Sequence, residues 1–177
     1  IIQKRLLEAL MEKGVRIVDP ESTKVCWDTR IQKGTIVFPF TVIESNVKIG
    51  KACRIGPFCH LREGVVIHDN SVVGNFTELS RTKLGGGTLA KHFCYLGDAR
   101  IGKKVNIGAG TVTANFDGKK KSATIIEDNA FIGSNSTLIA PVKVGKRATT
   151  GAGSVVTRNR NVPSGVTVVG VPAKPFK

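Results

Sequence analysis

The side chains best suited to proton transfer and polar binding lie between Leu89 and Ile126. His92 and Tyr95 stand three residues apart, Asn106 follows, and an Asp-Gly pair precedes three consecutive lysines. A neutral imidazole can accept a proton near neutral pH, and an Asp-Gly turn can carry lysines as a positive tip. Alone, such a lysine segment is more simply a solvated surface loop, so its meaning depends on the elements that surround it.

A regular recurrence of aliphatic residues defines those elements. From Val25 an aliphatic side chain returns every six residues, with one-residue slips before Leu84 and Ile101. Four residues after each one comes a small or β-branched residue, as at Thr29 and Cys53. The series is Val25, Ile31, Val37, Ile43, Ile49, Ile55, Leu61, Ile67, Val73, Leu79, Leu84, Ala90, Leu96, Ile101, Ile107, Ile126, Ile132, Leu138, Val144, Thr150, Val156, Val162 and Val168.

Neither a helix nor a hairpin has a period of six, which instead predicts an all-β fold, a parallel β-helix. Each hexad would form a short strand and a turn, three hexads would complete a triangular coil, and stacked coils would bury the aliphatic column. We expect this domain to cover residues 15–168, followed by a tail over 169–177. The recurrence is interrupted between Thr113 and Ile126. This interruption predicts an extruded loop over residues 113–125.

The opening segment predicts one short amphipathic helix over residues 1–14. Its apolar residues fall on one helical stripe, and Gly14 stands where a C-terminal cap is expected. The stripe consists of Ile2, Leu6, Leu7, Leu10 and Met11. We expect the helix to cap the domain, or to connect it to an upstream domain, rather than to bind a partner.

The composition fits one globular domain with a positive surface. The chain has 177 residues, is 41% hydrophobic and has a net charge of +14, which suits anionic ligands. No apolar run is long enough to span a membrane and no signal-peptide pattern is present, so we expect a cytoplasmic protein without membrane contact. Cys53, Cys59 and Cys94 fall on the small interior position, which favours free thiols over disulfides.

Four segments resemble a known family. "VGNFTELSRTKLG", "AKHFCYLGDARIG", "VNIGAGTVTANFDG" and "TIIEDNAFIGSNSTLIAPVKVG" are similar to the acetyltransferase domains of the GlmU family, hexapeptide-repeat enzymes that acetylate glucosamine-1-phosphate and then make UDP-N-acetylglucosamine. The similarity covers nearly the whole chain. It implies a left-handed β-helix, a homotrimer with active sites between subunits, and a nucleotidyltransferase domain preceding this one in a longer parent chain.

The resemblance also implies direct acetyl transfer from acetyl-CoA to an amine. His92 corresponds to the general base that takes the proton from the sugar ammonium, and Glu78 to the carboxylate that orients it. The backbone N–H of Ala109 would stabilise the tetrahedral oxyanion. Ser134 would protonate the departing thiolate, and Ser134 and Ala152 would contact the coenzyme. No metal is implied.

The same comparison implies the residues that bind the acceptor sugar. Tyr95 and Asn106 match residues that hold the sugar, and Asn115 lies in the match to the substrate loop. Arg62 and Lys121 match basic contacts to the sugar phosphate. We therefore expect an amino-sugar phosphate as the small-molecule substrate.

Three departures from the family pattern bear on that acceptor. Ser80 stands where the family has a phosphate-binding lysine, so the contact either moves to Arg81 or is lost. Phe116 replaces a tyrosine of the loop, and Gly170 replaces an arginine that helps to hold the coenzyme. The acceptor is thus glucosamine-1-phosphate or a closely related amino sugar.

Other classes fit the sequence less well. A β-helix carbonic anhydrase needs three metal-binding histidines, and His60, His68 and His92 lack the required spacing. The basic residues are scattered and few aromatic residues accompany them, so we expect no nucleic-acid partner. Cys94 as an acyl carrier is disfavoured, because alternation sends its side chain to the face opposite His92. An acetyltransferase for another amino sugar and a non-catalytic scaffold remain the alternatives.

Overall fold

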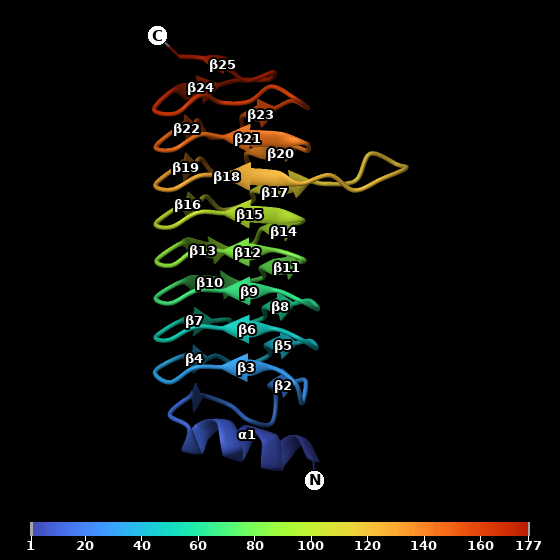
Figure 1. Cartoon of the computed structure of the whole chain (residues 1–177), viewed down its shortest axis with the longest axis vertical. Helices are drawn as coiled ribbons and strands as arrows, with labels where there is room; N and C mark the ends of the chain where they lie inside the picture. The colour runs from blue at the N-terminus through green and yellow to red at the C-terminus, as the bar shows by residue number, and fades with distance from the viewer. Residues whose placement is uncertain (1, 177) are drawn as a thin grey trace.

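The computed structural model describes residues 2–176, which form a triangular prism of stacked coils (Figure 1). Three sheets make its walls, and the chain passes through them in the order A, B, C in each coil. All strand pairs are parallel except the last one in sheet A, between β24 and β25. We call the line of turns from sheet A to sheet B the A–B edge, and that from sheet B to sheet C the B–C edge.

Most strands are only two or three residues long, because each hexad spends the rest of its length on a turn. Sheet A contains β1 (Arg16–Ile17), β4 (Ile36–Val37), β7 (Arg54–Ile55), β10 (Val72–Asn75), β13 (Leu89–His92), β16 (Asn106–Ile107), β19 (Phe131–Ile132), β22 (Thr149–Thr150), β24 (Thr167–Val169) and β25 (Lys174–Pro175). Sheet B contains β2 (Lys24–Val25), β5 (Val42–Ile43), β8 (His60–Leu61), β11 (Glu78–Ser80), β14 (Tyr95–Gly97), β17 (Val112–Ala114), β20 (Thr137–Ile139) and β23 (Val155–Val156). Sheet C contains β3 (Arg30–Ile31), β6 (Lys48–Ile49), β9 (Val66–Ile67), β12 (Lys83–Leu84), β15 (Ala99–Ile101), β18 (Thr124–Ile126) and β21 (Val142–Val144).

The predicted β-helix is confirmed, and its core is the predicted column. Every member of the six-residue series from Val25 to Val168 is buried. Burying one such aliphatic side chain contributes about 1.5–3 kcal/mol relative to leaving it exposed. In Figure 1 the chain crosses the front in sheet C from right to left and returns behind it through sheet A while it climbs, so the coil is left-handed.

The second interior position carries small side chains whose hydroxyl groups serve the backbone. Thr35 is fully buried, donates to the Gly50 carbonyl at 2.7 Å and accepts from the Cys53 N–H at 3.0 Å. Thr82 does the same between the Leu96 carbonyl, at 2.8 Å, and the Ala99 N–H, at 3.2 Å. A buried hydroxyl is tolerated here because it satisfies polar groups at the turns.

The N-terminal helix α1 (Ile2–Glu12) closes the lower end of the prism (Figure 1). Gly14 has a φ of 85°, and its N–H donates to the Met11 carbonyl at 2.9 Å, which is the predicted glycine cap. The predicted apolar stripe is only partly correct. Leu7 and Leu10 are buried against the prism, whereas Ile2 and Met11 are exposed.

The predicted extruded loop is present and is slightly shorter than expected. β17 extends to Ala114 and β18 begins at Thr124, so residues 115–123 leave the prism at the B–C edge (Figure 1). Phe116 and Lys121 form an antiparallel bridge at its base. At its tip the Asp117 carboxylate accepts from the N–H groups of Lys119 and Lys120, at 3.0 and 2.8 Å.

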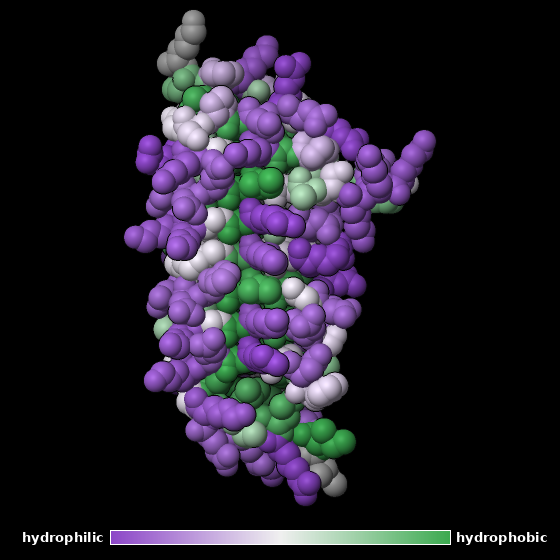
Figure 2. All heavy atoms as spheres, in the orientation of Figure 1, coloured by the Kyte–Doolittle hydropathy of each residue, from purple (hydrophilic) through white to green (hydrophobic). Residues whose placement is uncertain are grey.

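The outer face of sheet C carries a column of basic side chains. Figure 2 looks onto sheet C, where hydrophilic side chains cross a hydrophobic stripe. The exposed basic residues of this face lie in one column set by strand register: Arg30, Lys48, Lys83, Arg100 and Lys143. Sheets A and B expose apolar side chains, including Val42, Val112 and Phe131, beside basic residues such as Arg54 and Lys24. Within residues 2–176 no helix has the length and apolar character needed to cross a membrane.

Candidate active site

The A–B edge aligns His92 with the residues predicted to contact acetyl-CoA. His92 ends β13, pairs in register with Asn75 and is exposed. Successive coils above it present Ala109, Ser134 and Ala152 at the same turn. The turns are stacked by hydrogen bonds: Gly110 N–H to the Phe93 carbonyl at 2.9 Å, Asn135 N–H to the Ala109 carbonyl at 2.6 Å, and Gly153 N–H to the Ser134 carbonyl at 2.8 Å.

Two of these groups keep the hydrogen-bonding capacity that the predicted chemistry needs. Among residues 2–176 the Ala109 N–H donates to no protein acceptor within hydrogen-bond distance, because its turn uses the neighbouring Gly110 N–H to join the coil below. The Ser134 side chain is exposed and makes no hydrogen bond within the described chain. A donor and a hydroxyl are therefore accessible along the edge above His92.

Glu78 lies on the outer face of sheet B, one coil below Tyr95 and one coil above His60. Its Oε1 accepts from Nη1 of Arg62 at 3.1 Å. In the described residues no hydrogen bond joins Glu78 to His92, so the predicted orienting contact is not formed in this single chain. Arg62 and Glu78 form an ion pair across the outer face of sheet B, because Glu78 begins β11 and Arg62 follows β8.

A second polar cluster occupies the B–C edge. Arg81 donates to both carboxylate oxygens of Asp98, from Nε to Oδ1 at 2.6 Å and from Nη2 to Oδ2 at 2.9 Å. Asn115 donates from Nδ2 to Oδ2 of Asp98. The Arg81 guanidinium, followed by the Asn115 bond, holds the pKa of Asp98 below its usual range despite partial burial, and Asp98 raises the pKa of Arg81.

Tyr95 reaches this cluster across Gly97. A Cβ at Gly97 would lie 2.6 Å from both the Tyr95 hydroxyl oxygen and Nδ2 of Asn115, so only glycine allows the two side chains this approach. Ser80 is 2% exposed and cannot offer its hydroxyl to a ligand. The neighbouring Arg81 has an exposed guanidinium, and the basic group at this turn is therefore Arg81.

The remaining predicted substrate residues do not gather in one chain. Asn106 pairs with Leu89 and Phe131 on the outer face of sheet A, away from Tyr95 on sheet B. Lys121 projects on the loop from the B–C edge, whereas His92 stands at the A–B edge. Lys121 and His92 of one chain therefore stand apart, because sheet B separates the two edges.

The cysteines and the other histidines have structural surroundings. Cys94 is buried, donates from Sγ to Oγ1 of Thr77 at 3.7 Å, and has its pKa raised to about 11 by burial. Its thiol points into the core, away from His92 as expected, but the reason is the turn at Phe93 after β13, because alternation alone would place residues two apart on the same face. His60 bonds Oε1 of Glu44 at 2.7 Å. Across residues 2–176 no group of three or more His, Cys, Asp and Glu side chains could hold a metal ion.

Two features escaped the sequence interpretation. Asp98 belongs to the B–C cluster, and the only sequence signal that could have indicated it is its position directly after a predicted strand. Phe40, Phe58 and Phe76 stack along the A–B edge, with ring centroids 4.9 and 5.2 Å apart, and all three are exposed. Their regular spacing of eighteen residues, one coil each, is the signal that could have revealed the stack.

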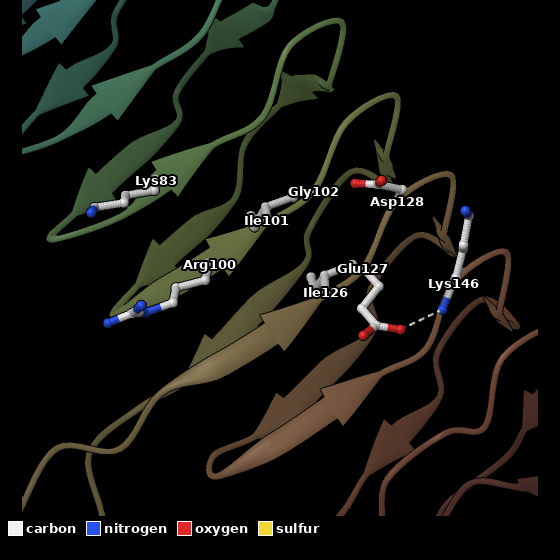
Figure 3. A pocket seen from close by; sticks show the side chains of 8 residues that line it. All are labelled: Lys83, Arg100, Ile101, Gly102, Ile126, Glu127, Asp128 and Lys146. Carbon is white, nitrogen blue, oxygen red and sulfur yellow. Dashed lines mark hydrogen bonds between the residues drawn. The ribbon is translucent and has the colours of Figure 1, made fainter.

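The hollow drawn in Figure 3 belongs to another part of the surface. It lies on sheet C and contains none of the predicted site residues. Its acids already serve the fold, because Asp128 accepts from the Lys103 N–H at 2.8 Å and Glu127 from the Lys146 N–H at 3.0 Å. We therefore place the candidate active site at the edges of sheet B.

Comparison with known proteins agrees with the repeat and the fold. A family model described as bacterial transferase hexapeptide (six repeats) matches residues 46–81, and one described as hexapeptide repeat of succinyl-transferase matches residues 123–158. The UDP-N-acetylglucosamine acyltransferases of Francisella novicida and Arabidopsis share the fold, with TM-scores of 0.68 and 0.67 at 19% and 18% identity. They align with 90% and 93% of this chain and with 69% and 68% of their own chains.

The fold and the repeats define a hexapeptide-repeat β-helix protein. The chain is 41% identical to the bifunctional protein GlmU of Thermotoga maritima over 89% of its length and 43% of that protein. It is 45% identical to GlmU of Thermosipho africanus, over 89% of this chain and 42% of that protein. The predicted similarity to the acetyltransferase domain of the GlmU family is confirmed over the part of these proteins that the chain covers. It spans less than half the length of these curated relatives.

Proposed function

We propose that this chain is an acetyl-CoA-dependent N-acetyltransferase for glucosamine-1-phosphate or a closely related amino-sugar phosphate, and that it feeds UDP-N-acetylglucosamine synthesis. The observation that carries the proposal is the alignment of His92 with Ala109, Ser134 and Ala152 along one edge of the prism. An extended coenzyme could lie along such an edge with its thioester near His92. The similarity to the GlmU proteins supports the same assignment.

The proposed reaction is direct transfer without an acyl-enzyme. His92 takes a proton from the sugar ammonium, and the free amine attacks the thioester carbonyl carbon. The Ala109 N–H donates to the oxygen that becomes negative in the tetrahedral intermediate. The carbon–sulfur bond then breaks, the thiolate takes a proton from Ser134 or water, and the nitrogen loses its second proton to solvent.

The substrate side of the site is proposed to read a sugar and a phosphate separately. Tyr95, Asn106 and Asn115 supply a hydroxyl and two amides that can bond sugar hydroxyl groups. Arg62, Arg81 and Lys121 supply the positive charge that a phosphate monoester needs. The acceptor class therefore follows from the mixture of neutral polar groups and cations among these residues.

A homotrimer is proposed because one chain leaves the site incomplete. Asn106 and Tyr95 face outward from different sheets, and Lys121 leaves from the edge opposite His92. A neighbouring copy would bring a second set of these residues to each A–B edge. The phenylalanine stack supports packing there, because Phe40, Phe58 and Phe76 form one exposed apolar patch.

The test is acetyl transfer to a matched panel of acceptors. Release of coenzyme A and formation of the N-acetyl product would be followed with glucosamine-1-phosphate, galactosamine-1-phosphate and glucosamine. We expect turnover with a phosphorylated amino sugar and much less with glucosamine. Transfer only to an unphosphorylated amino sugar would favour the alternative acetyltransferase, and no transfer to any acceptor by the trimer would leave the scaffold interpretation.

A further inference from the structure

We propose that Asp98 is a positioning residue that fixes Arg81 and Asn115 as one unit for reading the phosphorylated end of the acceptor. The inference rests on the proposed function and names a residue that the sequence motifs did not assign. Asp98 follows β14, at the B–C edge where the extruded loop leaves the prism. Its role follows from what its carboxylate does to the two side chains that it bonds.

Asp98 orients the Arg81 guanidinium so that it can donate hydrogen bonds to a phosphate. Two of the five guanidinium N–H groups are occupied by the carboxylate, from Nε and Nη2, so three remain. The Arg81 side chain is 46% exposed, whereas that of Asp98 is 19% exposed. The carboxylate is thus covered behind the guanidinium, which presents its free donors outward in a fixed plane.

The same carboxylate determines which atom Asn115 can offer. Nδ2 of Asn115 donates to Oδ2 of Asp98, which leaves Oδ1 as the atom available to a ligand. Asn115 is only 7% exposed and the Tyr95 hydroxyl lies close to it across Gly97, so the amide has little freedom to turn. Asn115 would therefore accept a hydrogen bond from a sugar hydroxyl or amine.

The backbone of Asp98 anchors both ends of this unit. Its N–H donates to the Ser80 carbonyl at 2.9 Å, next to Arg81, and its carbonyl accepts from the Thr124 N–H at 3.2 Å. The Asn115 carbonyl accepts from the Ser122 N–H at 2.8 Å, which closes the root of the loop. Asp98 therefore connects the coil below, its own coil and the loop above.

The position at which the family has a phosphate-binding lysine is occupied here by the buried Ser80. Ser80 is turned inward, so the phosphate contact that the family motif places there passes to Arg81, one residue further on. Without Asp98 the guanidinium would be mobile and Asn115 could reverse its amide. Asp98 itself would not touch the substrate.

The experiment compares Asp98→Asn, Arg81→Gln and the double variant with the wild-type trimer. Glu127→Gln is the matched control, because Glu127 also pairs with a cation, Lys143 at 2.7 Å, on a face away from the site. Dissociation constants for glucosamine-1-phosphate and glucosamine are measured by calorimetry without acetyl-CoA, and steady-state kinetics follow. Circular dichroism confirms folding, and Arg81→Gln tests the unit if Asp98→Asn does not fold.

We expect Asp98→Asn and Arg81→Gln each to weaken glucosamine-1-phosphate binding by about 10- to 100-fold, as for loss of a charge-assisted hydrogen bond. The double variant should be no weaker than Asp98→Asn, and the KM for acetyl-CoA should not change. Additive losses, or equal losses for glucosamine, would overturn the proposal. A wild-type chain that binds the phosphate but transfers no acetyl group would refute the proposed function alone.

Discussion

Arg158 donates a hydrogen bond of 2.8 Å from Nη2 to Oδ2 of Asp117, and so ties the tip of the extruded loop to the turn after β23. The other carboxylate oxygen of Asp117 holds the N–H groups of Lys119 and Lys120. The loop therefore has a defined shape although it stands clear of the prism (Figure 1). Lys121, which begins the return to β18, is carried at a fixed position rather than on a free chain.

Lys121→Ala should raise the KM for glucosamine-1-phosphate about tenfold or more, because it removes a cation from the phosphate while the backbone of the loop persists. Lys119→Ala is the matched control, since only the backbone of Lys119 bonds Asp117. Steady-state kinetics with phosphorylated and unphosphorylated acceptors make the measurement. An equal loss for both acceptors would show that the loop does not read phosphate.

His92→Ala should lower turnover by about two to four powers of ten, because the general base is lost. His92 is exposed, so circular dichroism and assembly should not change. His68→Ala serves as the control, since His68 is also exposed and lies outside the proposed site. Near-normal turnover in His92→Ala, with coenzyme A release recorded directly, would exclude the proposed mechanism.

Cys94→Ala should keep most of its activity, because its thiol faces the core and the proposed reaction forms no acyl-enzyme. Burial raises the pKa of Cys94 to about 11 and that of Cys59 still further, so neither is a thiolate near neutral pH. A thiol reagent should label the partly exposed Cys26 first and the buried cysteines slowly. Rapid labelling of Cys94 by an acetyl donor would restore the acyl-carrier mechanism.

The free energy of unfolding should fall as the pH decreases below about 4. Arg81 lowers the pKa of Asp98, the Lys120 N–H that of Asp117, and Lys143 that of Glu127. Carboxylates with depressed pKa values stabilise the fold fully above their unfolded pKa, about 4, and lose that contribution as pH falls through the folded value. Urea unfolding between pH 2.5 and 7 measures this, and Asp98→Asn should show a smaller change. Identical curves would contradict the Asp98 contribution.

The buried interior could be predicted from the sequence because the β-helix needs an apolar side chain every six residues. Each coil needs apolar side chains such as Ile55 and Leu61 at fixed positions, so periodicity alone located the core. The apolar stripe of α1 failed at Ile2 and Met11 because a helix period does not say how wide the covered surface is. The glycine cap at Gly14 was predicted correctly, because a helix cap depends on residues next to it in the sequence.

The polar cluster could not be predicted because its contacts join residues one coil apart, after slips in the repeat. Arg81 and Asp98 are separated by seventeen residues, and the slip before Leu84 changes which residues meet at the turn. Family motifs supplied Asn115 and Lys121 but gave no indication that Asp98 orients Asn115. The separation of His92 from Lys121 is likewise a property of the prism edges, which the linear sequence does not display.

Phe58→Asp should dissociate the proposed trimer. Phe58 is the middle ring of the stack on the A–B edge, and a carboxylate there would place charge inside an apolar contact between copies. Light scattering with size-exclusion chromatography should show a monomer, and acetyl transfer should be lost because the site is shared. Trp27→Asp, which changes an exposed aromatic residue away from the stack, should remain trimeric. A wild-type chain that is monomeric at micromolar concentration and still turns over would refute the shared site.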